Sequence, residues 1–311
     1  MNQTVRESEY YGYLFVHFVG ESEIGEQVYF SLSRDGLHFE DLNNSLPVLY
    51  SKVGELGARD PFMIRDEENN KFYLIATDLR IASGKGWGVA QDSGSKNLVV
   101  WESNDLIHWS DEILVEVGIP SAGCVWAPEA IYDKENKDFL VFWASKVKEE
   151  TDTESKQRIY CSRTKDFKTY SNTEKYIERE NHVIDTTIIE HNGMYYRFSK
   201  DETTKNIRID RASQLTGLDF TDVHMPCVEG LLGVEGPIIY KFNDREEWCL
   251  LVDQFATGKG YLPLVTNDLE NGDFRVLQAD EYDMGLSKKR HGSMLKITKE
   301  EYDNLVNHYN K

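Results

Sequence analysis

Residues 57–78, "GARDPFMIRDEENNKFYLIATD", contain two apolar runs that are separated by a short charged loop. Both runs are short and rich in aromatic or β-branched residues, which is typical of two β-strands joined by a turn. Asp60 stands in "RDPF", where the first strand begins, and neither core packing nor turn chemistry requires a carboxylate there. The stretch therefore predicts a β-hairpin with an acid at its start that has no evident structural purpose.

The start of this hairpin recurs along the chain. The segments "APEAI", "DTTII", "EGPII" and "HGSML" resemble "DPFMI" in their length and in their apolar fourth and fifth positions, as buried strands require. Their leading residues, together with that of "DPFMI", are Asp60, Ala127, Asp185, Glu235 and His291. Repetition of one supersecondary unit predicts a repeat architecture.

A second repeated element is a turn of the form Ser/Thr-x-Asp, which follows a strand in each unit. It reads "SRDGLHF", "SNDLIHW", "TKDFKTY" and "TNDLENG", with a degenerate copy "ASQLTGL". The third positions are Asp35, Asp105, Asp166, Asp268 and, in the degenerate copy, Gln214. A short acceptor side chain bonds readily to its own turn, so we expect a structural role for these aspartates.

The two chain ends each carry half a unit. The segment at His291 has no turn after it, and the turn at Asp35 has no strand-start segment before it. The economical solution is an all-β, five-bladed β-propeller whose closing blade is shared by the N- and C-terminal strands. Five such units fill the chain, which predicts a single propeller domain over residues 1–311. "TKEEYDNLVNHY" predicts a short C-terminal helix that begins with a capping box of Thr298 and Glu301.

Composition narrows the function classes. The chain has 311 residues, of which 40% are hydrophobic and 12% aromatic, and its formal net charge is −19. That charge argues against nucleic acid or an anionic membrane as a partner, and no segment approaches the roughly 18 apolar residues of a membrane span. The N-terminus lacks a basic region followed by an apolar one, so the sequence predicts a cytoplasmic protein. The four cysteines show no pairing or metal-type spacing and are expected to be free thiols.

Closing the ring brings the five leading positions together. The first strand of each propeller blade lines the central channel, so three acids, one imidazole and one alanine would face one another. A lectin propeller would repeat one pocket, whereas this chain places a different residue in almost every blade. Glycoside hydrolysis needs paired carboxylates, one to protonate the leaving oxygen and one to activate water. A third acid would raise the pKa of the donor by repulsion. The alternative is that the acids only cap strands or hold channel water.

At these residues the sequence resembles glycoside hydrolase family 43 over essentially its full length. The resemblance rests on "RDPFMI" with "FYLIATD", "VWAPEAIYD" with "FLVFWAS", "IDTTII" with "MYYRF", "VEGPIIYK" with "WCLLVD", and "RHGSML". It implies a five-bladed propeller and an inverting mechanism, with Asp60 as general base, Asp185 as pKa modulator and orienter, and Glu235 as general acid. One departure is that about fifty residues precede Asp60, where many members begin with the base-bearing strand. The loops around the mouth should therefore differ.

The resemblance also implies a substrate class. We expect an exo-acting glycosidase that removes terminal pentosides from plant cell-wall oligosaccharides, an α-L-arabinofuranosidase acting on arabinoxylan or arabinan side chains. A β-xylosidase is the alternative within the fold, and a non-catalytic sugar-binding propeller is a third reading. An invertase-like enzyme is disfavoured because its Asn-Asp-Pro-Asn and Glu-Cys motifs are absent. The sequence leaves the oligomeric state open.

Several other residues are candidates for substrate contact. Trp126 precedes the alanine of its segment and is either a sugar platform or a core tryptophan. The Gly/Ser-rich loop 80–97 carries Trp87, as a subsite wall or an exposed loop residue, and Gln91. Arg290 either bonds a sugar hydroxyl or neutralises the acids.

The channel histidine raises the question of a metal. His291 resembles the family's channel histidine, which often sits beside calcium or water, so a structural calcium ion and an ion-free histidine are both open. No cofactor is required for the chemistry. Glu129, two residues beyond Ala127, is expected to touch substrate or metal-bound water, or to pair with Arg290 or Arg59.

Overall fold

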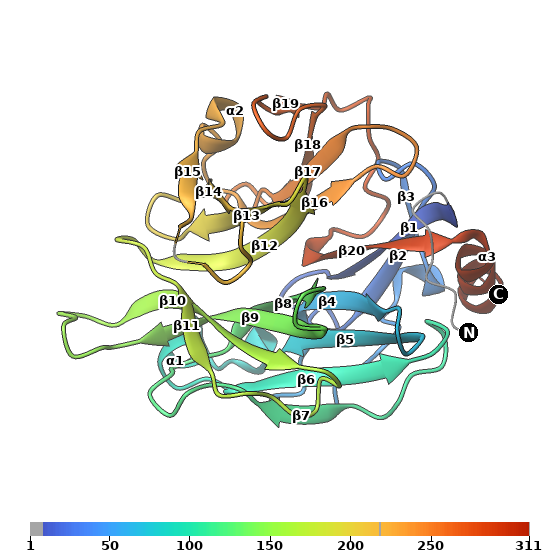
Figure 1. Cartoon of the computed structure of the whole chain (residues 1–311). Coiled ribbons are helices and arrows are strands. Elements are labelled where there is room, and N and C mark those ends of the chain that lie inside the picture. Colours follow the sequence, from blue (N-terminus) through green and yellow to red (C-terminus); the bar gives the residue numbers. More distant parts are fainter. Residues whose placement is uncertain (1–8, 218, 311) are drawn as a thin grey trace.

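The computed structural model describes residues 9–217 and 219–310, and the N-terminal residues 1–8, on which the expectation of a missing leader rests, lie outside that range. Within the described chain, five four-stranded antiparallel sheets stand around a common centre (Figure 1). This confirms the predicted five-bladed β-propeller. Among the described residues, none of the helices is long and apolar enough to cross a membrane.

Each blade runs from an innermost to an outermost strand. Blade I consists of β4 (Arg59–Asp66), β5 (Lys71–Thr77), β6 (Asn97–Ser103) and β7 (Ile113–Glu116). Blade II consists of β8 (Trp126–Asp133), β9 (Asp138–Val147), β10 (Lys156–Thr164) and β11 (Glu174–Ile177). Blade III consists of β12 (Val183–His191), β13 (Met194–Asp201), β14 (Asn206–Ala212) and β15 (Thr221–Val223). Blade IV consists of β16 (Glu235–Lys241), β17 (Trp248–Asp253), β18 (Tyr261–Thr266) and β19 (Arg275–Val276).

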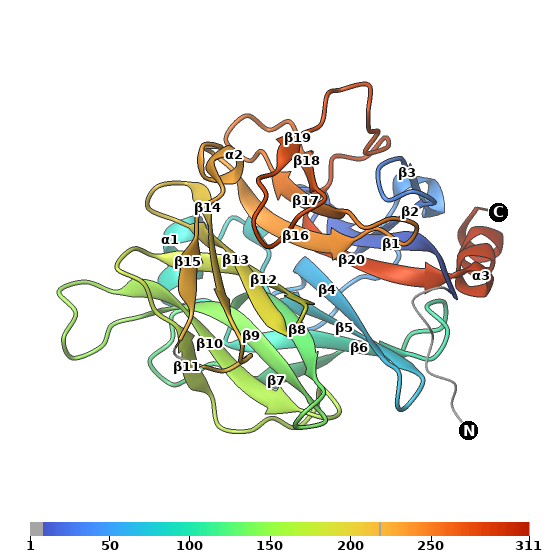
Figure 2. The same cartoon turned by 45° about the horizontal axis from the view of Figure 1, so that its top comes forward.

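The closing blade joins the two ends of the chain, as the half-units predicted. It consists of β20 (Arg290–Thr298), β1 (Tyr10–Phe18), β2 (Tyr29–Ser33) and β3 (Phe39–Asp41). The C-terminal β20 pairs with the N-terminal β1, so that Leu14 stands opposite Leu295 and Val16 opposite Ser293. Figures 1 and 2 both show the red β20 beside the blue β1. Backbone hydrogen bonds between the two ends therefore close the ring.

The innermost strands β4, β8, β12, β16 and β20 contact one another in sequence around the channel, and β20 returns to β4. Between the blades, side chains of neighbouring sheets pack into separate apolar clusters. Trp101 lies in the cluster between the closing blade and blade I, and Trp143 lies in the one between blades I and II. Each tryptophan is at most 2% exposed. Truncating such a side chain typically costs about 3–5 kcal/mol, so these clusters hold the blades in place.

The Ser/Thr-x-Asp turns have the structural role that was predicted for them. Asp105 Oδ1 accepts hydrogen bonds from the backbone N–H groups of Ile107 and His108 at 3.0 and 2.8 Å. Ser103 Oγ accepts from the N–H of Leu106 at 3.0 Å. Equivalent bonds occur at Asp35, Asp166 and Asp268. The aspartates thus satisfy the orphan backbone donors of tight turns.

Few helices accompany the sheets in residues 9–217 and 219–310. They are α1 (Trp87–Asp92), α2 (Pro226–Glu229) and α3 (Lys299–Tyr309), with 3-10 turns at Asn43–Ser45 and Ile81–Ser83. The predicted C-terminal helix is α3, and its capping box is present because Thr298 and Glu301 bond each other's backbone N–H groups. Glu301 also accepts from Arg65 NH1 at 2.6 Å, which fastens α3 to blade I. The four cysteines are free, as expected.

Candidate active site

A cavity of about 460 Å³ opens among the innermost strands, a size typical of small-ligand sites. Apart from Glu129, it gathers the site residues that the sequence nominated: Asp60, Trp87, Gln91, Trp126, Asp185, Glu235, Arg290 and His291. The carboxylates come from blades I, III and IV, so residues that are far apart in sequence become neighbours through the ring.

A β-bulge at the start of each innermost strand aims these side chains. Asp60, Ala127 and Asp185 all have φ of 48°, in the left-handed region, and each stands where the pairing with the next strand shifts register. In blade IV the left-handed residue is Gly236, with φ of 52°, rather than Glu235. A non-glycine residue rarely adopts this conformation, and its recurrence in three blades shows that the bulge has the same backbone geometry in each.

The bulges correct the alignment of Glu235 with Asp60. Glu235 pairs with Asp253 just as Arg59 pairs with Thr77, so Glu235 is the counterpart of Arg59 and not of Asp60. The expectation that Glu235 and Asp60 occupy equivalent positions was therefore wrong by one residue. The prolines at positions 61, 128 and 237 carry the correct alignment in the sequence, whereas the apolar positions that follow do not.

Two tiers of residues consequently surround the cavity. The bulge tier contains Asp60, Ala127, Asp185, Gly236 and His291, and the tier one residue earlier contains Arg59, Trp126, Ile184, Glu235 and Arg290. Glu235 and Asp60 thus differ in tier as well as in blade.

Asp60 is held by a threonine from the neighbouring strand. Thr77 Oγ1 donates to Asp60 Oδ2 at 2.8 Å and accepts from the backbone N–H of Ala127, also at 2.8 Å. Because the alanine N–H occupies the acceptor side of the hydroxyl, the threonine proton is directed toward Asp60. Thr77 is fully buried. The carboxylate therefore has one fixed orientation in the cavity.

Asp185 is the least exposed of the three carboxylates, with 10% of its side chain exposed against 15% for Asp60 and 20% for Glu235. Its Oδ2 accepts from the backbone N–H of Gly236 at 3.1 Å, and its Oδ1 lies 3.7 Å from His291 Nδ1. Burial raises the pKa of Asp185 to about 6, although the imidazole of His291 and the ammonium of Lys200 oppose the rise. Asp185 therefore changes its protonation near neutral pH, close to the other two carboxyl groups.

Glu235 stands between two cations. Its Oε2 lies 2.7 Å from Lys200 Nζ, and its Oε1 lies 2.8 Å from Arg290 NH2. Although burial favours the neutral acid, Lys200 and Arg290 lower the pKa of Glu235 below its usual value. The expectation that neighbouring acids raise the pKa of the donor is thus not met at Glu235, because two cations outweigh the acids; Asp185 has the raised pKa instead.

Sequence reasoning missed Thr77 and Lys200, which hold Asp60 and Glu235, and Asp253, which holds Arg290. Thr77, Lys200 and Asp253 stand at or next to the end of the second strand in blades I, III and IV, opposite the start of the innermost strand. Asp253 is fully buried and pairs with Arg290 Nε. In the sequence they close the runs "FYLIAT", "YYRFSK" and "WCLLVD", where a polar residue looks like an ordinary strand end. Arg290 itself neutralises acids, which was one of its two predicted roles.

Blade II and the loop over blade I supply an aromatic wall. The rings of Trp87 and Trp126 meet edge to face with centroids 5.8 Å apart, and both line the cavity. The loop 80–97 contains the short helix α1, whose first turn carries Trp87 and whose second carries Gln91. Arg59 lies 5.0 Å from the Trp87 ring and pairs with the buried Glu26 at 2.8 Å. Glu26 belongs to the loop between β1 and β2.

The groups around His291 do not fit a metal cage. In the described part of the chain, no three His, Cys, Asp or Glu side chains converge as metal ligands. His291 Nδ1 lies 3.6 Å from Asp60 Oδ1 and 3.7 Å from Asp185 Oδ1, distances suited to weak charge interaction. Calcium takes six to eight oxygen ligands at about 2.3–2.6 Å, so these residues alone would not hold it.

Glu129 is not among the residues that line the cavity. It is 5% exposed, and burial raises the pKa of its carboxyl well above the usual value, which favours the neutral acid. Thr187 is its hydrogen-bond partner. The predicted pairing with Arg290 or Arg59 is wrong, because Arg290 pairs with Glu235 and Asp253, and Arg59 pairs with Glu26 and Glu21.

The α-L-arabinofuranosidase of Bifidobacterium longum subsp. longum is 30% identical over 289 residues, which are 79% of this chain and 27% of that protein. The chain thus spans about a quarter of the length of that relative.

Solved structures share the fold at low identity. A family 43 β-1,3-galactosidase has a TM-score of 0.62 at 12% identity and covers 88% of this chain and 58% of its own. The catalytic domain of a Coprinopsis cinerea family 62 α-L-arabinofuranosidase has a TM-score of 0.53 at 13% identity, covering 76% and 72%. An exo-β-1,3-galactanase of Phanerochaete chrysosporium has a TM-score of 0.54 at 15% identity, covering 77% and 55%.

The family match extends over nearly the whole propeller. Residues 8–303 match the family described as a probable glycosyl hydrolase domain, related to glycoside hydrolase family 43. This range begins just before β1 and ends within α3, so it includes both halves of the closing blade. With the carboxylates placed as above, the chain belongs to the glycosyl hydrolase family 43-related domain family.

Proposed function

We propose that this protein is an inverting exo-glycosidase that removes terminal α-L-arabinofuranosyl groups from plant cell-wall oligosaccharides such as arabinoxylan or arabinan side chains. The observation that carries the proposal is the convergence of Asp60, Asp185 and Glu235 in one cavity, in three different electrostatic settings. The arabinofuranosidase relative supports the choice of sugar.

In this proposal Asp60 is the general base. Thr77 fixes its carboxylate through Oδ2. In the described residues, the imidazole of His291 is the only ion-pair partner of Asp60, and it approaches Oδ1. An ionised, oriented carboxylate is suited to take a proton from the attacking water. Asp185, with its intermediate pKa, orients the site and modulates the charge that the other two groups experience.

Glu235 is the general acid. In the free enzyme Lys200 and Arg290 hold it ionised, so the proton must be taken up as substrate binds. A sugar that excludes water and accepts a hydrogen bond from Arg290 would weaken the pairing with Glu235 and raise its pKa. The acid then protonates the leaving oxygen while Asp60 activates water on the opposite face of the ring.

A panel of nitrophenyl glycosides tests the sugar. We expect the highest kcat/KM on the α-L-arabinofuranoside, a lower value on the β-D-xyloside, and little activity on the β-D-galactoside. The galactoside is included because fold neighbours act on β-1,3-galactan. Glu235→Gln serves as the control for contaminating hydrolase. A preference for the xyloside or galactoside would replace arabinose as the substrate, and an inactive wild-type protein would refute the catalytic proposal. First-formed product of retained configuration would refute inversion.

A further inference from the structure

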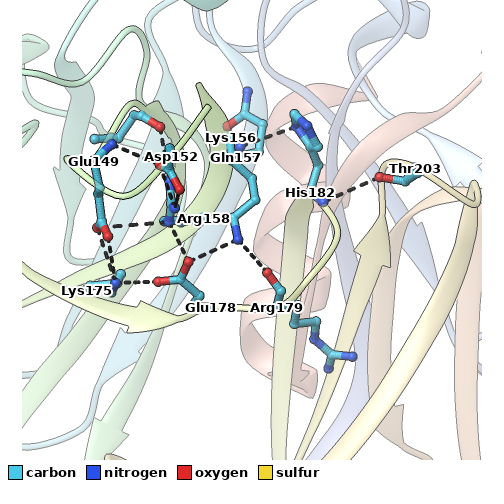
Figure 3. A network of polar contacts seen from close by, with 11 residues as sticks. Glu149, Asp152, Lys156, Gln157, Arg158, Lys175, Glu178, Arg179, His182 and Thr203 are labelled. Carbon is cyan, nitrogen blue, oxygen red and sulfur yellow. Dashed lines mark hydrogen bonds and ion pairs between the residues drawn. The ribbon is translucent and has the colours of Figure 1, made fainter. Parts of the chain in front are cut away.

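A network of charged side chains joins the β9–β10 hairpin to the segment that enters β12 (Figure 3). The Arg158 side chain is 1% exposed, and its NH2 lies 2.7 Å from both carboxylate oxygens of Asp152. Arg158 Nε donates to Glu178 Oε1 at 2.9 Å, and Lys156 Nζ donates to the carbonyl of Arg179 at 2.7 Å. These bonds tie hairpin residues 152–158 to the segment 178–182, and together the two form one wall.

The wall ends at the cavity, in a histidine that the sequence did not single out. His182 Nδ1 accepts a hydrogen bond from the backbone N–H of Gln157 at 3.3 Å. The backbone N–H of His182 donates to Thr203 Oγ1 at 3.4 Å, and its backbone carbonyl accepts from the backbone N–H of Glu202 at 2.9 Å. His182 and Gln157 both line the cavity, so the histidine is held by its backbone and its ring.

The hydrogen bond to Nδ1 decides which ring nitrogen carries the proton. A nitrogen that accepts from a backbone N–H has no hydrogen of its own, so the neutral ring carries its hydrogen on Nε2. Burial, assisted by Lys146, lowers the pKa of His182 and keeps the ring neutral at pH 7. No hydrogen bond in the described chain uses Nε2, whereas the Gln157 amide is turned toward Cys124 Sγ at 3.7 Å. His182 thus offers a donor that the protein itself does not use.

The wall is linked to Glu235, the proposed general acid, and not to Asp60. The backbone of His182 bonds to Glu202, the carboxylate of Glu202 lies 2.6 Å from Lys200 Nζ, and Lys200 pairs with Glu235. The contacts of Asp60 are with Thr77 and His291 instead. In an inverting glycosidase the acid meets the leaving group, whereas the base faces the opposite side of the sugar.

We propose that His182 is a specificity-determining residue that donates from Nε2 to a hydroxyl of the leaving-group sugar. The assignment rests on the proposed function, specifically on Glu235 as the acid. Because the network of Figure 3 fixes the ring before substrate arrives, little ordering is needed to form the bond. A single hydrogen bond of this kind changes an equilibrium by about 3- to 10-fold.

A pair of substrates with the same terminal sugar tests this assignment. α-1,5-Arabinotriose has a sugar as its leaving group, and 4-nitrophenyl α-L-arabinofuranoside does not. In His182→Phe, kcat/KM should fall about 3- to 10-fold on the trisaccharide and change less than about twofold on the aryl substrate. His182→Gln, whose amide places a donor near the Nε2 position, should restore most of the loss. Melting temperatures identify any misfolded variant, and His182→Leu replaces the phenylalanine if it fails to fold.

The outcomes separate this inference from the general proposal. An equal fall on both substrates would place His182 against the terminal sugar or the catalytic groups, and no fall on the trisaccharide would leave it without a substrate contact; either result overturns the assignment. If the glycoside panel identifies another terminal sugar, the matched oligosaccharide and aryl glycoside of that sugar are used. Wild-type protein that cleaves neither substrate refutes the proposed function, and the assignment falls with it.

Discussion

Lys200 Nζ lies 2.7 Å from Glu235 Oε2, and the lysine that holds this glutamate is only 2% exposed. The same ammonium lies 2.6 Å from Glu202 and 4.3 Å from the centre of the Phe255 ring. A buried lysine with two carboxylate partners keeps its proton, and its pKa is raised accordingly, although burial opposes the rise. The charge next to the proposed acid is therefore permanent, and it sets the pH at which the acid can act.

Replacing Lys200 with methionine should move the basic limb of the pH profile. A general acid is active below its pKa, and the cations beside Glu235 lower that pKa. Without the ammonium the pKa of Glu235 rises, so activity should persist to higher pH by about one pH unit or more. The kcat/KM profile on the preferred aryl glycoside measures the shift, and Lys200→Arg, which keeps a cation, is the control. A loss of activity with an unmoved basic limb would reduce Lys200 to a structural role.

Thr77→Val should impair the orientation of Asp60. The variant keeps the shape of the side chain but removes both hydrogen bonds, to Asp60 and from Ala127. We expect kcat to fall about tenfold with little change in KM, because a misplaced base is penalised chiefly in the transition state. The unpaired alanine N–H should also cost about 1–3 kcal/mol of unfolding free energy. Thr77→Ser should recover both quantities; a drop in stability alone would deny any role in catalysis.

Arg158→Met should destabilise the wall between blades II and III. The guanidinium is almost fully buried and holds Asp152, Glu178 and the carbonyl of Val147. Its removal leaves Asp152 without the cation that it pairs with, whereas Glu178 keeps Lys156 and Lys175. Breaking a buried pair costs about 3–5 kcal/mol. Because Asp152 and Glu178 are partly exposed, we expect the lower end of that range. Urea denaturation measures it, with Lys299→Met, which removes an exposed ion pair, as the control.

The repeat pattern predicted the ring and the main residues of the site because a propeller converts equivalent positions into neighbours. The carboxylates at Asp60 and Asp185 were visible as acids at strand starts with no structural purpose. The one-residue offset of Glu235 was not visible from the apolar positions, because residues 238–240, "IIY", are all apolar and satisfy the fourth and fifth positions in either alignment. Only the proline at position 237, read against those at 61 and 128, signals it.

The electrostatic setting of the site could not be predicted from the sequence. Lys200 and Arg290 lie ninety residues apart in the chain, and only the closed ring places both beside Glu235. The tautomer of His182 likewise depends on a backbone N–H from the neighbouring blade. Residue types at strand starts indicate what chemistry is available, whereas the charge state of each group depends on contacts between blades.

Asp185→Asn should stabilise the protein at neutral pH. A carboxyl whose pKa rises from 3.8 to about 6 on folding stabilises the fold fully below pH 3.8, and that stabilisation is lost as pH rises through 6. The loss corresponds to ~3 kcal/mol. Asparagine does not titrate and can still accept from the N–H of Gly236. The unfolding free energy of the Asp185→Asn variant should exceed that of the wild type by ~1–3 kcal/mol at pH 7–8 and match it below about pH 4. Equal stability at both pH values would contradict a buried, ionising Asp185.

Asp60→Ala and Glu235→Ala should respond differently to the leaving group. An acid matters in proportion to the need of the departing oxygen for a proton, whereas a base acts on water whatever departs. General acid or base catalysis typically contributes about 10²–10⁴ in rate, or roughly 3–5 kcal/mol of barrier. Glu235→Ala should lose most of that factor on oligosaccharides and much less on dinitrophenyl glycosides, and Asp60→Ala should lose it on both. Steady-state kcat/KM across aryl glycosides of graded leaving-group pKa measures the difference. If Asp60→Ala is the variant that good leaving groups spare, the two roles are reversed.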